Sequence, residues 1–396
     1  MIILYPVPEL LPDSRARFIQ IVNTCHSLAE KGFQVRLITG VCKGYSMGGI
    51  PGYYGLPDNK NLEVVALPML RRDAASLFRF SWHGLFHYSL LSYLFLFKAT
   101  EREQAVLFVR HLKLADFLLA CSRLLNLPML FEAHEVFSED KEVKTLLREK
   151  RVYSRSDGLV FISKKLEKRI KSIIPAAADK PCIVAHDGVR SDWLSEDFTR
   201  DGKKYICYTG SLYPWKGIDV LIAAMDLLPD ETLLIAGGGK RLNELKGMAE
   251  RRGLKNIIFT GEVRHQSVPG ILAHAKMAVL PNINSGPSAF SSPLKLFEYM
   301  AFGLPIVASD IEVFREVLVH RKNAMLVRPD DPEALASGIK SLLKDTAMTK
   351  NIAVQARQDV ADFTYERRVE KIIGLISRMN DISGRSQWTR QSGRNA

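Results

Sequence analysis

The residues of this chain best suited to binding an anion lie in the segment SSPLKLFEYM, residues 291–300. Ser291 and Ser292 suit a helix N-cap, and Pro293 suits the first helical position, where its missing N–H group costs nothing. The start of a helix offers unpaired N–H groups and the positive end of a dipole, and Lys295 adds a charge to the first turn. The segment therefore predicts a phosphate-binding site at the start of a helix.

Glu298 stands five residues after Pro293 on the same predicted helix. At a rise of 1.5 Å per residue, this spacing is about 7.5 Å along the helix axis. A diphosphate bound at the helix start would place the ribose of a nucleotide near this carboxylate, which can accept hydrogen bonds from both ribose hydroxyls. The alternative is an ordinary surface helix in which Lys295 and Glu298 form a pair. Gly303 is expected to end the helix in the left-handed conformation, before a buried strand in the run PIVAS.

Strand-like and helical runs alternate through the first half of the chain, which predicts a parallel, doubly wound α/β sheet. The first strand is expected at about Met1–Tyr5. Six more strand-like runs follow: VRLIT, LEVVAL, AVLFVR, PMLFEA, GLVFIS and PCIVAH. Ligands of such sheets bind at the carboxyl ends of the strands, so the residues just after each strand are expected to matter most. These are the loop from Pro6 to Arg17, and Arg110, His134 and Ser163.

The same alternation starts again at KYICYTG, residues 204–210, and predicts a second sheet of the same kind. Lys216 stands in the loop after this strand. A glycine turn at residues 237–239 follows the strand-like run LLIA, but the spacing G-x-G-x-x-G is not present. The turn therefore does not predict a dinucleotide site.

Together these motifs resemble the donor site of retaining glycosyltransferases of family four. That family has the GT-B fold, in which two Rossmann-like, doubly wound parallel-sheet domains face a central cleft. The resemblance covers nearly the whole chain and is strongest from Tyr205 to Ser309. It implies donor-diphosphate contacts from Ser211, Lys216, Ser291, Ser292, Leu294 and Lys295, a ribose contact from Glu298, and base-side contacts from Gly237, Gly238, Val263 and Arg264.

The sequence departs from the usual pattern of the family at two positions. Phe290 stands where the family commonly has a second glutamate, and Ser211 stands where it has an arginine that clamps the diphosphate. Lys216 matches the lysine of that clamp, although a lysine neutralises phosphate as a point charge and lacks the bidentate geometry of arginine. We expect Lys295 to supply the second positive charge.

His134 follows the strand-like run PMLFEA in the sequence E-A-H-E-V. In the family, a histidine at this place faces the donor sugar and stabilises an oxocarbenium-like transition state. The resemblance thus implies catalytic roles for His134 and Lys216. The alternative is a histidine whose hydrogen bonds are satisfied at a strand end. Glu132 and Glu135 are expected to be structural or surface groups.

The loop after the first strand, PVPELLPDSRAR, lacks the glycine pair that family members often carry there. Arg15 and Arg17 in this loop, together with Arg110, are expected on the acceptor side, where they could receive an anionic acceptor. A solvated first helical turn is the alternative for Arg15 and Arg17.

The most hydrophobic run is Ser76–Phe97, and its last 18 residues include no Asp, Glu, Lys or Arg. This length touches the lower limit for a membrane span, but the run contains histidines, a glycine and serines inside an alternating soluble pattern, so a span is not expected. Aromatic residues with basic residues at both ends suit a helix that lies at a membrane interface. A buried helix of the domain is the alternative.

A length of 396 residues makes two domains the natural expectation. The N-terminal, acceptor-side domain is expected to cover residues 1–190 and to be joined by a C-terminal helix at about 365–380. The nucleotide-sugar-binding domain is expected at 200–364, after a polar linker within 186–204. Residues 381–396 are polar and biased in composition, and are expected to be disordered.

The net charge is +12, and residues 1–200 and 201–396 each carry +6, so there is no basic arm. Such charge suits a phosphate-bearing substrate, an anionic membrane surface or nucleic acid. Nucleic acid is not expected as a partner, because the basic residues are dispersed and no nucleic-acid-binding module is recognisable. Five scattered cysteines indicate reduced thiols and no zinc site, and the chain opens directly into a strand without a signal peptide. These features predict a cytoplasmic protein, either free or peripheral on the inner face of the cell membrane.

The expected function is transfer of a sugar, with retention, from a nucleotide-diphosphate sugar to an acceptor hydroxyl. The product would be a cell-surface polysaccharide, a glycolipid or a related glycoconjugate, and neither a metal nor another cofactor is expected. The acceptor is unidentified, and a lipid-linked or otherwise anionic one is expected. The alternatives are a sugar-nucleotide epimerase with the GT-B fold, a catalytically silent sugar-nucleotide binder and a nucleic-acid-binding protein.

Overall fold

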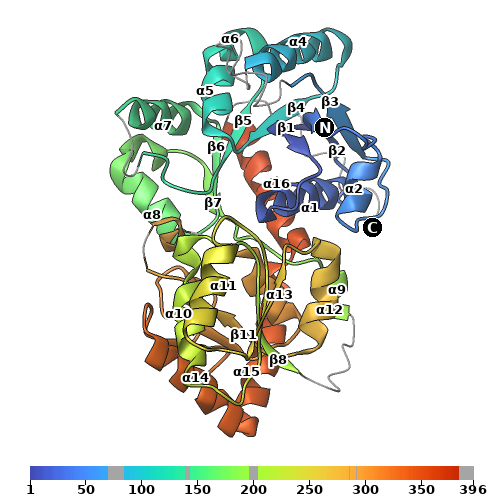
Figure 1. Ribbon diagram of the computed structural model, residues 1–396. Coiled ribbons are helices and arrows are strands. Elements are labelled where there is room, and N and C mark those ends of the chain that lie inside the picture. The colour runs from blue at the N-terminus through green and yellow to red at the C-terminus, as the bar shows by residue number, and fades with distance from the viewer. Residues whose placement is uncertain (70–83, 139–142, 196–203, 285, 291, 383–396) are drawn as a thin grey trace. The chain divides into compact units, whose positions relative to one another are not determined.

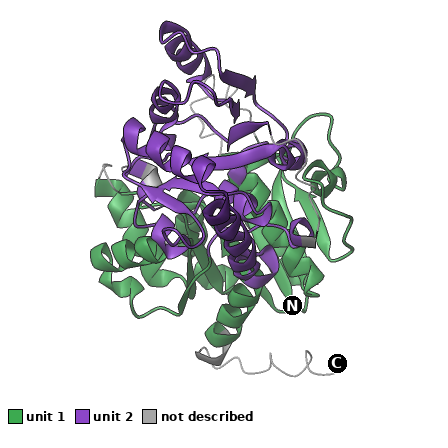
Figure 2. Ribbon diagram, turned by 90° about the horizontal axis from the view of Figure 1, so that it is seen from below, with its two compact units in different colours: residues 1–13, 17–185, 368–396 green, residues 14–16, 186–367 purple. Residues whose placement is uncertain are grey.

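The computed structural model describes residues 1–69, 84–138, 143–195, 204–284, 286–290 and 292–382. The chain forms two compact units, which are coloured separately in Figure 2. Unit 1 takes the described residues within 1–13, 17–185 and 368–396, and unit 2 takes those within 14–16 and 186–367. Each unit is built on one parallel sheet, as the alternating sequence pattern predicts (Figure 1).

The sheet of unit 1 has seven strands in the order β3-β2-β1-β4-β5-β6-β7. Its strands are β1 (Ile2–Leu11), β2 (Gln34–Val41), β3 (Leu62–Ala66), β4 (Ala105–Val109), β5 (Met129–Ala133), β6 (Gly158–Phe161) and β7 (Cys182–Val184). Its helices are α1 (Ala16–Glu30), α2 (Gly49–Tyr53), α4 (Gly84–Thr100), α5 (Leu112–Ala120), α6 (Ser122–Leu125), α7 (Val143–Arg155), α8 (Lys164–Ile173) and most of α16 (Tyr365–Ile382). All of the strand-like runs predicted in the first half of the sequence are confirmed.

The sheet of unit 2 has six strands in the order β10-β9-β8-β11-β12-β13. Its strands are β8 (Tyr205–Thr209), β9 (Leu233–Ala236), β10 (Ile257–Gly261), β11 (Ala275–Leu280), β12 (Ile306–Ser309) and β13 (Met325–Val327). Its helices are α9 (Asp192–Ser195), α10 (Ile218–Met225), α11 (Leu242–Arg251), α12 (Val268–Ala273), α13 (Leu294–Ala301), α14 (Pro332–Lys344) and α15 (Thr346–Asp359). In both sheets the strand order reverses beside the first strand of the unit, which is where ligands of doubly wound sheets bind.

The core of unit 2 lies on both faces of its sheet. Successive residues of β8 alternate between two buried clusters: Ile206 and Tyr208 pack in one, and Cys207 packs in the other. Burial on both faces explains why the strands read as continuous apolar runs instead of alternating ones. It also leaves the ends of the strands as the places where polar side chains can gather.

Strand β1 is longer than predicted and continues to Leu11, so most of the predicted loop from Pro6 to Arg17 is wrong. Residues beyond Leu4 pair with β2 alone, because the pairing with β4 covers Ile2–Leu4. A strand with one partner tolerates proline on its open side, and this explains how Pro6 fits within it. A register shift between Val7 and Leu10 accommodates the rest of the segment.

The start of α13 also differs from the prediction. The helix begins at Leu294, and Pro293 occupies the N-cap position without a capping side chain. Ser292 is not the cap; its hydroxyl accepts a hydrogen bond of 3.0 Å from the backbone N–H of Asp187. Ser291 lies outside the described residues. The helix ends as predicted: Gly303 has a φ of 54°, and the N–H of Leu304 donates to the carbonyl of Tyr299 at 3.0 Å.

Helix α4 covers the later part of the hydrophobic run; residues 76–83 lie outside the described residues. Phe86, Leu90, Leu94 and Phe97 are buried, whereas Leu85, Tyr88, Phe95 and Leu96 are exposed. One face of the helix therefore belongs to the core, and the other presents an apolar stripe. In the part of the chain that the structure describes, no helix has both the length and the apolarity needed to span a membrane.

Candidate functional site

Lys295 lies in unit 2 in an unusual environment for a lysine. Its side chain is buried, with 8% of the residue exposed, and its ammonium lies 3.5 Å from the centroid of the Tyr208 ring. Among the described residues, Nζ has no hydrogen-bond partner. Burial, and next the charge of Lys216, hold the pKa of Lys295 well below its usual value. A buried ammonium supported by a ring face, without a hydrogen-bonded carboxylate, is well suited to receive an anion.

Lys216 ends the short 3₁₀ helix Pro214–Lys216 that follows β8. Burial lowers the pKa of this lysine to about 8. Gly217 turns the chain at a φ of 66°, and a Cβ atom there would lie 1.9 Å from the carbonyl oxygen of Pro281. Glycine is therefore required for the loop to approach the end of β11 and to bring Lys216 near Lys295.

The glycine turn after β9 approaches the end of β8 closely. A Cβ atom on Gly237 would lie 1.8 Å from the carbonyl oxygen of Gly210, and one on Gly238 would lie 2.9 Å from Cβ of Glu262. The N–H of Leu212 donates to the carbonyl of Gly238 at 3.1 Å. Gly237 and Gly238 thus bring the backbone of two neighbouring strand ends together, and a ligand at this edge of the sheet would meet backbone groups.

Glu298 is buried, and its Oε1 lies 2.7 Å from Nε2 of His265. The imidazole of His265 stacks on the indole of Trp193, with ring centroids 5.4 Å apart and an interplanar angle of 23°. The alternative of a surface helix with a Lys295–Glu298 pair is wrong, because every residue of α13 is buried. The sequence analysis missed His265 and Trp193; the only available signal was the position of His265 directly after the predicted base-side pair Val263 and Arg264.

The remaining predicted donor-side residues lie at the carboxyl edge of the same sheet. Ser211 is exposed directly after β8, and its carbonyl accepts a hydrogen bond of 2.8 Å from the Tyr208 hydroxyl. Val263 packs against the core behind β11 and β12, and Arg264 is exposed. Leu294 is buried at the start of α13. Phe290 is buried as well, so a buried aromatic ring occupies the position where a second carboxylate was considered.

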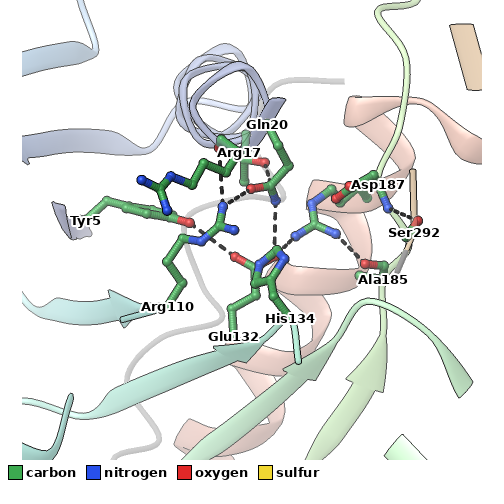
Figure 3. A network of polar contacts seen from close by, with 11 residues as sticks. Tyr5, Arg17, Gln20, Arg110, Glu132, His134, Ala185, Asp187 and Ser292 are labelled. Carbon is green, nitrogen blue, oxygen red and sulfur yellow. Dashed lines mark hydrogen bonds and ion pairs between the residues drawn. The ribbon is translucent and has the colours of Figure 1, made fainter. Parts of the chain in front are cut away.

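A second group of polar side chains surrounds Glu132 in unit 1 (Figure 3). Glu132 is fully buried at the end of β5 and accepts hydrogen bonds of 3.1 Å from both the Tyr5 hydroxyl and Gln20 Nε2. Arg368 of α16 also donates to this carboxylate. Burial alone would raise the pKa of Glu132, but Arg368 and then His134 hold it well below its usual value. Glu132 is thus a structural group, as one of the two predicted readings had it, and it remains ionised.

His134 lies beside this carboxylate, with Nε2 at 3.1 Å from Oε1 of Glu132. Burial, and next the charge of Arg110, lower the pKa of His134 to about 4. The imidazole is therefore neutral at neutral pH, although a carboxylate is close by. A neutral imidazole at a strand end can orient a ligand or stabilise positive charge, but it carries no charge of its own.

The three arginines predicted on the acceptor side do not all lie in the same unit. Arg110 donates to Gln20 Oε1 at 2.6 Å and to the carbonyl of Arg17 at 3.3 Å (Figure 3). Arg17 forms an ion pair with Glu9. Arg15 groups with unit 2, so the structure brings Arg17 and Arg110 together without it.

A cavity of about 470 Å³ opens beside Arg110 and His134, and all of its lining residues belong to unit 1. It is lined by Val7, Pro8, Glu9, Arg17, Ile21, Arg110, His111, Leu112, Lys113, His134, Glu135, Phe137, Thr145 and Arg148. These residues come from β1, α1, α7 and the segments that follow β4 and β5. Among the described residues, in this cavity and outside it, no group of three or more His, Cys, Asp and Glu side chains is arranged to hold a metal ion.

Comparison with known proteins agrees with this geometry. Residues 190–359 match the family model described as Glycosyl transferases group 1. An uncharacterized glycosyltransferase of Methanocaldococcus jannaschii is 24% identical over 245 residues, which cover 57% of this chain and 61% of that protein. The match thus spans less than two thirds of the relative. The similarity to the group 1 family model thus lies in the second half of the chain.

Solved structures resemble both units. Sucrose-phosphate synthase of Thermosynechococcus elongatus gives a TM-score of 0.75 at 17% identity and covers 96% of this chain and 99% of that one. Anabaena HepE, solved with UDP and glucose, gives a TM-score of 0.72 at 17% identity. The match covers 96% of this chain and 100% of that one. These similarities and the two sheets confirm the predicted GT-B fold of two Rossmann-like domains.

Proposed function

We propose that this protein is a retaining glycosyltransferase that moves a sugar from a nucleotide-diphosphate sugar to an acceptor hydroxyl. The observation that carries the proposal is the buried ammonium of Lys295, which has no hydrogen-bond partner among the described residues and lies close to Lys216. A buried ammonium beside a second positive charge is destabilised unless an anion lies between the two groups. A diphosphate supplies that anion. HepE, one of the similar structures, was solved with UDP and glucose, which supports a nucleotide sugar as the donor.

The other donor contacts follow from the edge of the sheet in unit 2. The backbone at Gly237 and Gly238 and the exposed residues Ser211 and Arg264 lie where the nucleotide would pass. Glu298, already oriented by His265, would accept hydrogen bonds from the ribose hydroxyls. The lysines stabilise the charge that develops on the leaving diphosphate, which is the largest contribution in sites of this kind.

We infer a front-face route for the transfer. The acceptor hydroxyl attacks from the side of the leaving group, and its proton goes to the departing phosphate oxygen, so the anomeric configuration is retained. His134, neutral and close to Glu132, would stabilise positive charge on the sugar. We propose that the reaction needs no metal ion, because Lys216 and Lys295 supply the positive charge that a metal would otherwise bring.

We further propose that the reaction serves the synthesis of a polysaccharide, glycolipid or related glycoconjugate, at the inner face of the cell membrane. The exposed apolar stripe of α4, made by Leu85, Tyr88, Phe95 and Leu96, supports a peripheral association with the membrane. The charge of +12 favours an anionic lipid surface and an anionic or lipid-linked acceptor.

Calorimetric titration with UDP and with a panel of sugar nucleotides tests the donor site. Lys216→Ala and Glu298→Ala should each weaken binding by on the order of 1.5–3 kcal/mol, or roughly ten- to hundredfold. Lys340→Ala, which changes an exposed lysine on α14, serves as the control and should leave the affinity unchanged. Unaltered affinity in both site variants would refute the assignment.

Turnover of the donor that binds, with and without crude acceptor lipids, tests the reaction. A glycosyltransferase needs the acceptor to release the nucleotide at its full rate. An epimerase would convert the donor without the acceptor, and a silent binder would show affinity without turnover.

A further inference from the structure

The cavity of unit 1 contains a second set of positive groups that the donor site does not use. We propose that it binds the phosphoryl group of the acceptor, so that the acceptor is a phosphate ester. The identification of this ligand as the acceptor rests on the proposed function. The binding of a phosphate ester in the cavity does not depend on it. Four of the residues that line the cavity are cationic, namely Arg17, Arg110, Lys113 and Arg148.

The start of α5 faces this cavity, since His111, Leu112 and Lys113 all line it. The helix has nine residues, and the His111 side chain caps it by accepting from the N–H of Leu114 at 3.3 Å. The N–H groups of Leu112 and Lys113 precede the first intrahelical hydrogen bond, so they have no carbonyl partner within the helix. Their partial positive charge adds to that of the cationic side chains, which favours an anion at this place.

The charges around the cavity are not balanced by its carboxylates. Glu9 and Glu135 are the acidic lining residues, and Glu9 pairs with Arg17. Arg110 donates hydrogen bonds to neutral oxygen atoms, Gln20 Oε1 and a backbone carbonyl, while the nearby carboxylate of Glu132 is bonded to Arg368. The cationic residues that line the cavity thus outnumber its acidic ones.

Arg148 lines the cavity from α7 and shares the carboxylate of Asp116, on α5, with another arginine. Its Nε donates to Asp116 at 3.1 Å, while Arg151 donates to the same carboxylate at 2.8 Å and 2.9 Å. One aspartate cannot neutralise two guanidinium groups. Arg148 therefore adds positive charge to the cavity from α7, beside α5.

The size and walls of the cavity indicate an ester rather than a free ion. A volume of about 470 Å³ is in the range of small-molecule sites and far exceeds that of one phosphate group. Val7, Ile21, Leu112 and Phe137 supply apolar wall, which suits the carbon skeleton of an ester. His134 lines the same cavity, so an ester whose phosphate lies at the start of α5 would extend toward the proposed reaction centre.

Calorimetry without any nucleotide tests the inference on the full chain. The probes are glycerol, inorganic phosphate, glycerol 1-phosphate and monomeric dihexanoyl phosphatidic acid. We expect both esters to bind, glycerol not to bind, and added salt to weaken the binding. Equal affinity for the two esters would indicate a soluble acceptor, and tighter binding of the phosphatidic acid would indicate a lipid phosphate.

Lys113→Gln should weaken the binding of both esters about tenfold, because a charged contact to phosphate is lost. Lys164→Gln is the matched control: it removes a lysine from the first turn of α8, which does not line the cavity. Thermal unfolding of each variant checks that it is folded. Absence of ester binding, binding of inorganic phosphate alone, or equal affinities in the two variants would overturn the inference.

A parallel titration with UDP separates the two proposals. UDP binding without ester binding would refute the phosphate ester and leave the donor site standing. Ester binding without binding of any nucleotide sugar would refute the proposed transfer and leave an anion-binding cavity in unit 1.

Discussion

At the scale of residues, the proposed donor site depends on two lysines, of which Lys295 is buried and Lys216 is partly exposed. Lys295 lies against the ring of Tyr208, and the pKa of Lys216 falls to about 8. An ordinary exposed lysine would keep its charge far above neutral pH. These two are charged at a cost that an incoming anion offsets, so ligand binding and protonation are coupled.

The coupling predicts the pH dependence of UDP binding. Lys216 is charged below a pH of about 8 and neutral above it, so the affinity should be highest at and below neutral pH and fall as the pH rises through 8. UDP binding should also take up protons at pH 8, because the bound anion raises the pKa of both lysines. Calorimetry in two buffers of different ionisation enthalpy measures this uptake. Proton release, or an affinity that is constant from pH 7 to 9, would contradict the site.

His134 gives a second prediction at this scale. Its pKa of about 4 leaves the imidazole neutral from pH 6 to 8, so its titration should not shape the rate in that range. If it stabilises the transition state, His134→Ala lowers kcat and leaves the affinity for the donor nearly unchanged. His274→Ala, at the exposed end of α12, is the control. A parallel loss of donor affinity and rate would assign His134 a structural role instead.

The sequence predicted part of these sites and could not predict the rest, for identifiable physical reasons. Lys295 and Glu298 were predicted from their places at the start and one turn along a single helix, and Lys216 was predicted from the family resemblance. His265 was missed, since its contact with Glu298 joins segments 33 residues apart and depends on tertiary packing. The role of Glu132 as the centre of a buried network was also hidden, because its partner Arg368 lies 236 residues away.

At the scale of elements, the strands were the most predictable part, since apolar runs buried on both faces leave a continuous signal. The errors fell at the ends of elements. The end of β1 was misplaced because two prolines within it suggest a loop, and the start of α13 was misplaced because Ser292 caps nothing and instead binds the N–H of Asp187. Local propensity describes neighbours in sequence, and here a distant partner decided the outcome.

The glycine turn after β9 gives a prediction at this scale. In Gly237→Ala, the new methyl group would meet the carbonyl of Gly210 at 1.8 Å, so the ends of β8 and β9 must separate. We expect a loss of about 1–3 kcal/mol in the free energy of unfolding and a weaker affinity for UDP. Gly270→Ala in α12 is the control, because nothing lies within 4 Å of its added Cβ. Chemical denaturation measures the first quantity and calorimetry the second; a Gly237→Ala protein as stable as the control variant would contradict the close approach.

The exposed apolar stripe of α4 gives a further prediction at the scale of elements. Vesicle flotation at low salt should show the protein with anionic vesicles but not with neutral ones, and high salt should release it. Tyr88→Ser with Leu96→Ser should reduce the bound fraction, because both side chains would leave the interface. Leu227→Ser, which alters an exposed apolar residue of unit 2, is the control. A protein that stays soluble with every lipid composition would contradict a membrane role for this helix.

At the scale of the whole molecule, the chain enters unit 2 after Ala185 and returns to unit 1 at Arg368. The positive net charge is shared evenly between the two halves of the chain. Each unit likewise has one proposed cationic site. Under the two proposals, unit 2 holds the lysine pair for the donor, and unit 1 holds the cationic cavity for the acceptor.

The return of the chain at Arg368 has a consequence for biosynthesis. A ribosome makes the sheet of unit 1 first, but Glu132 stays a buried carboxylate without its guanidinium partner until Arg368 emerges. By then every strand of unit 2 has been translated. Domains usually fold in the order of translation, yet here the first unit is completed only by α16, the last helix among the residues that the structure describes. The nascent N-terminal unit therefore spends most of the translation time incomplete, and that is the interval in which a chaperone would engage it.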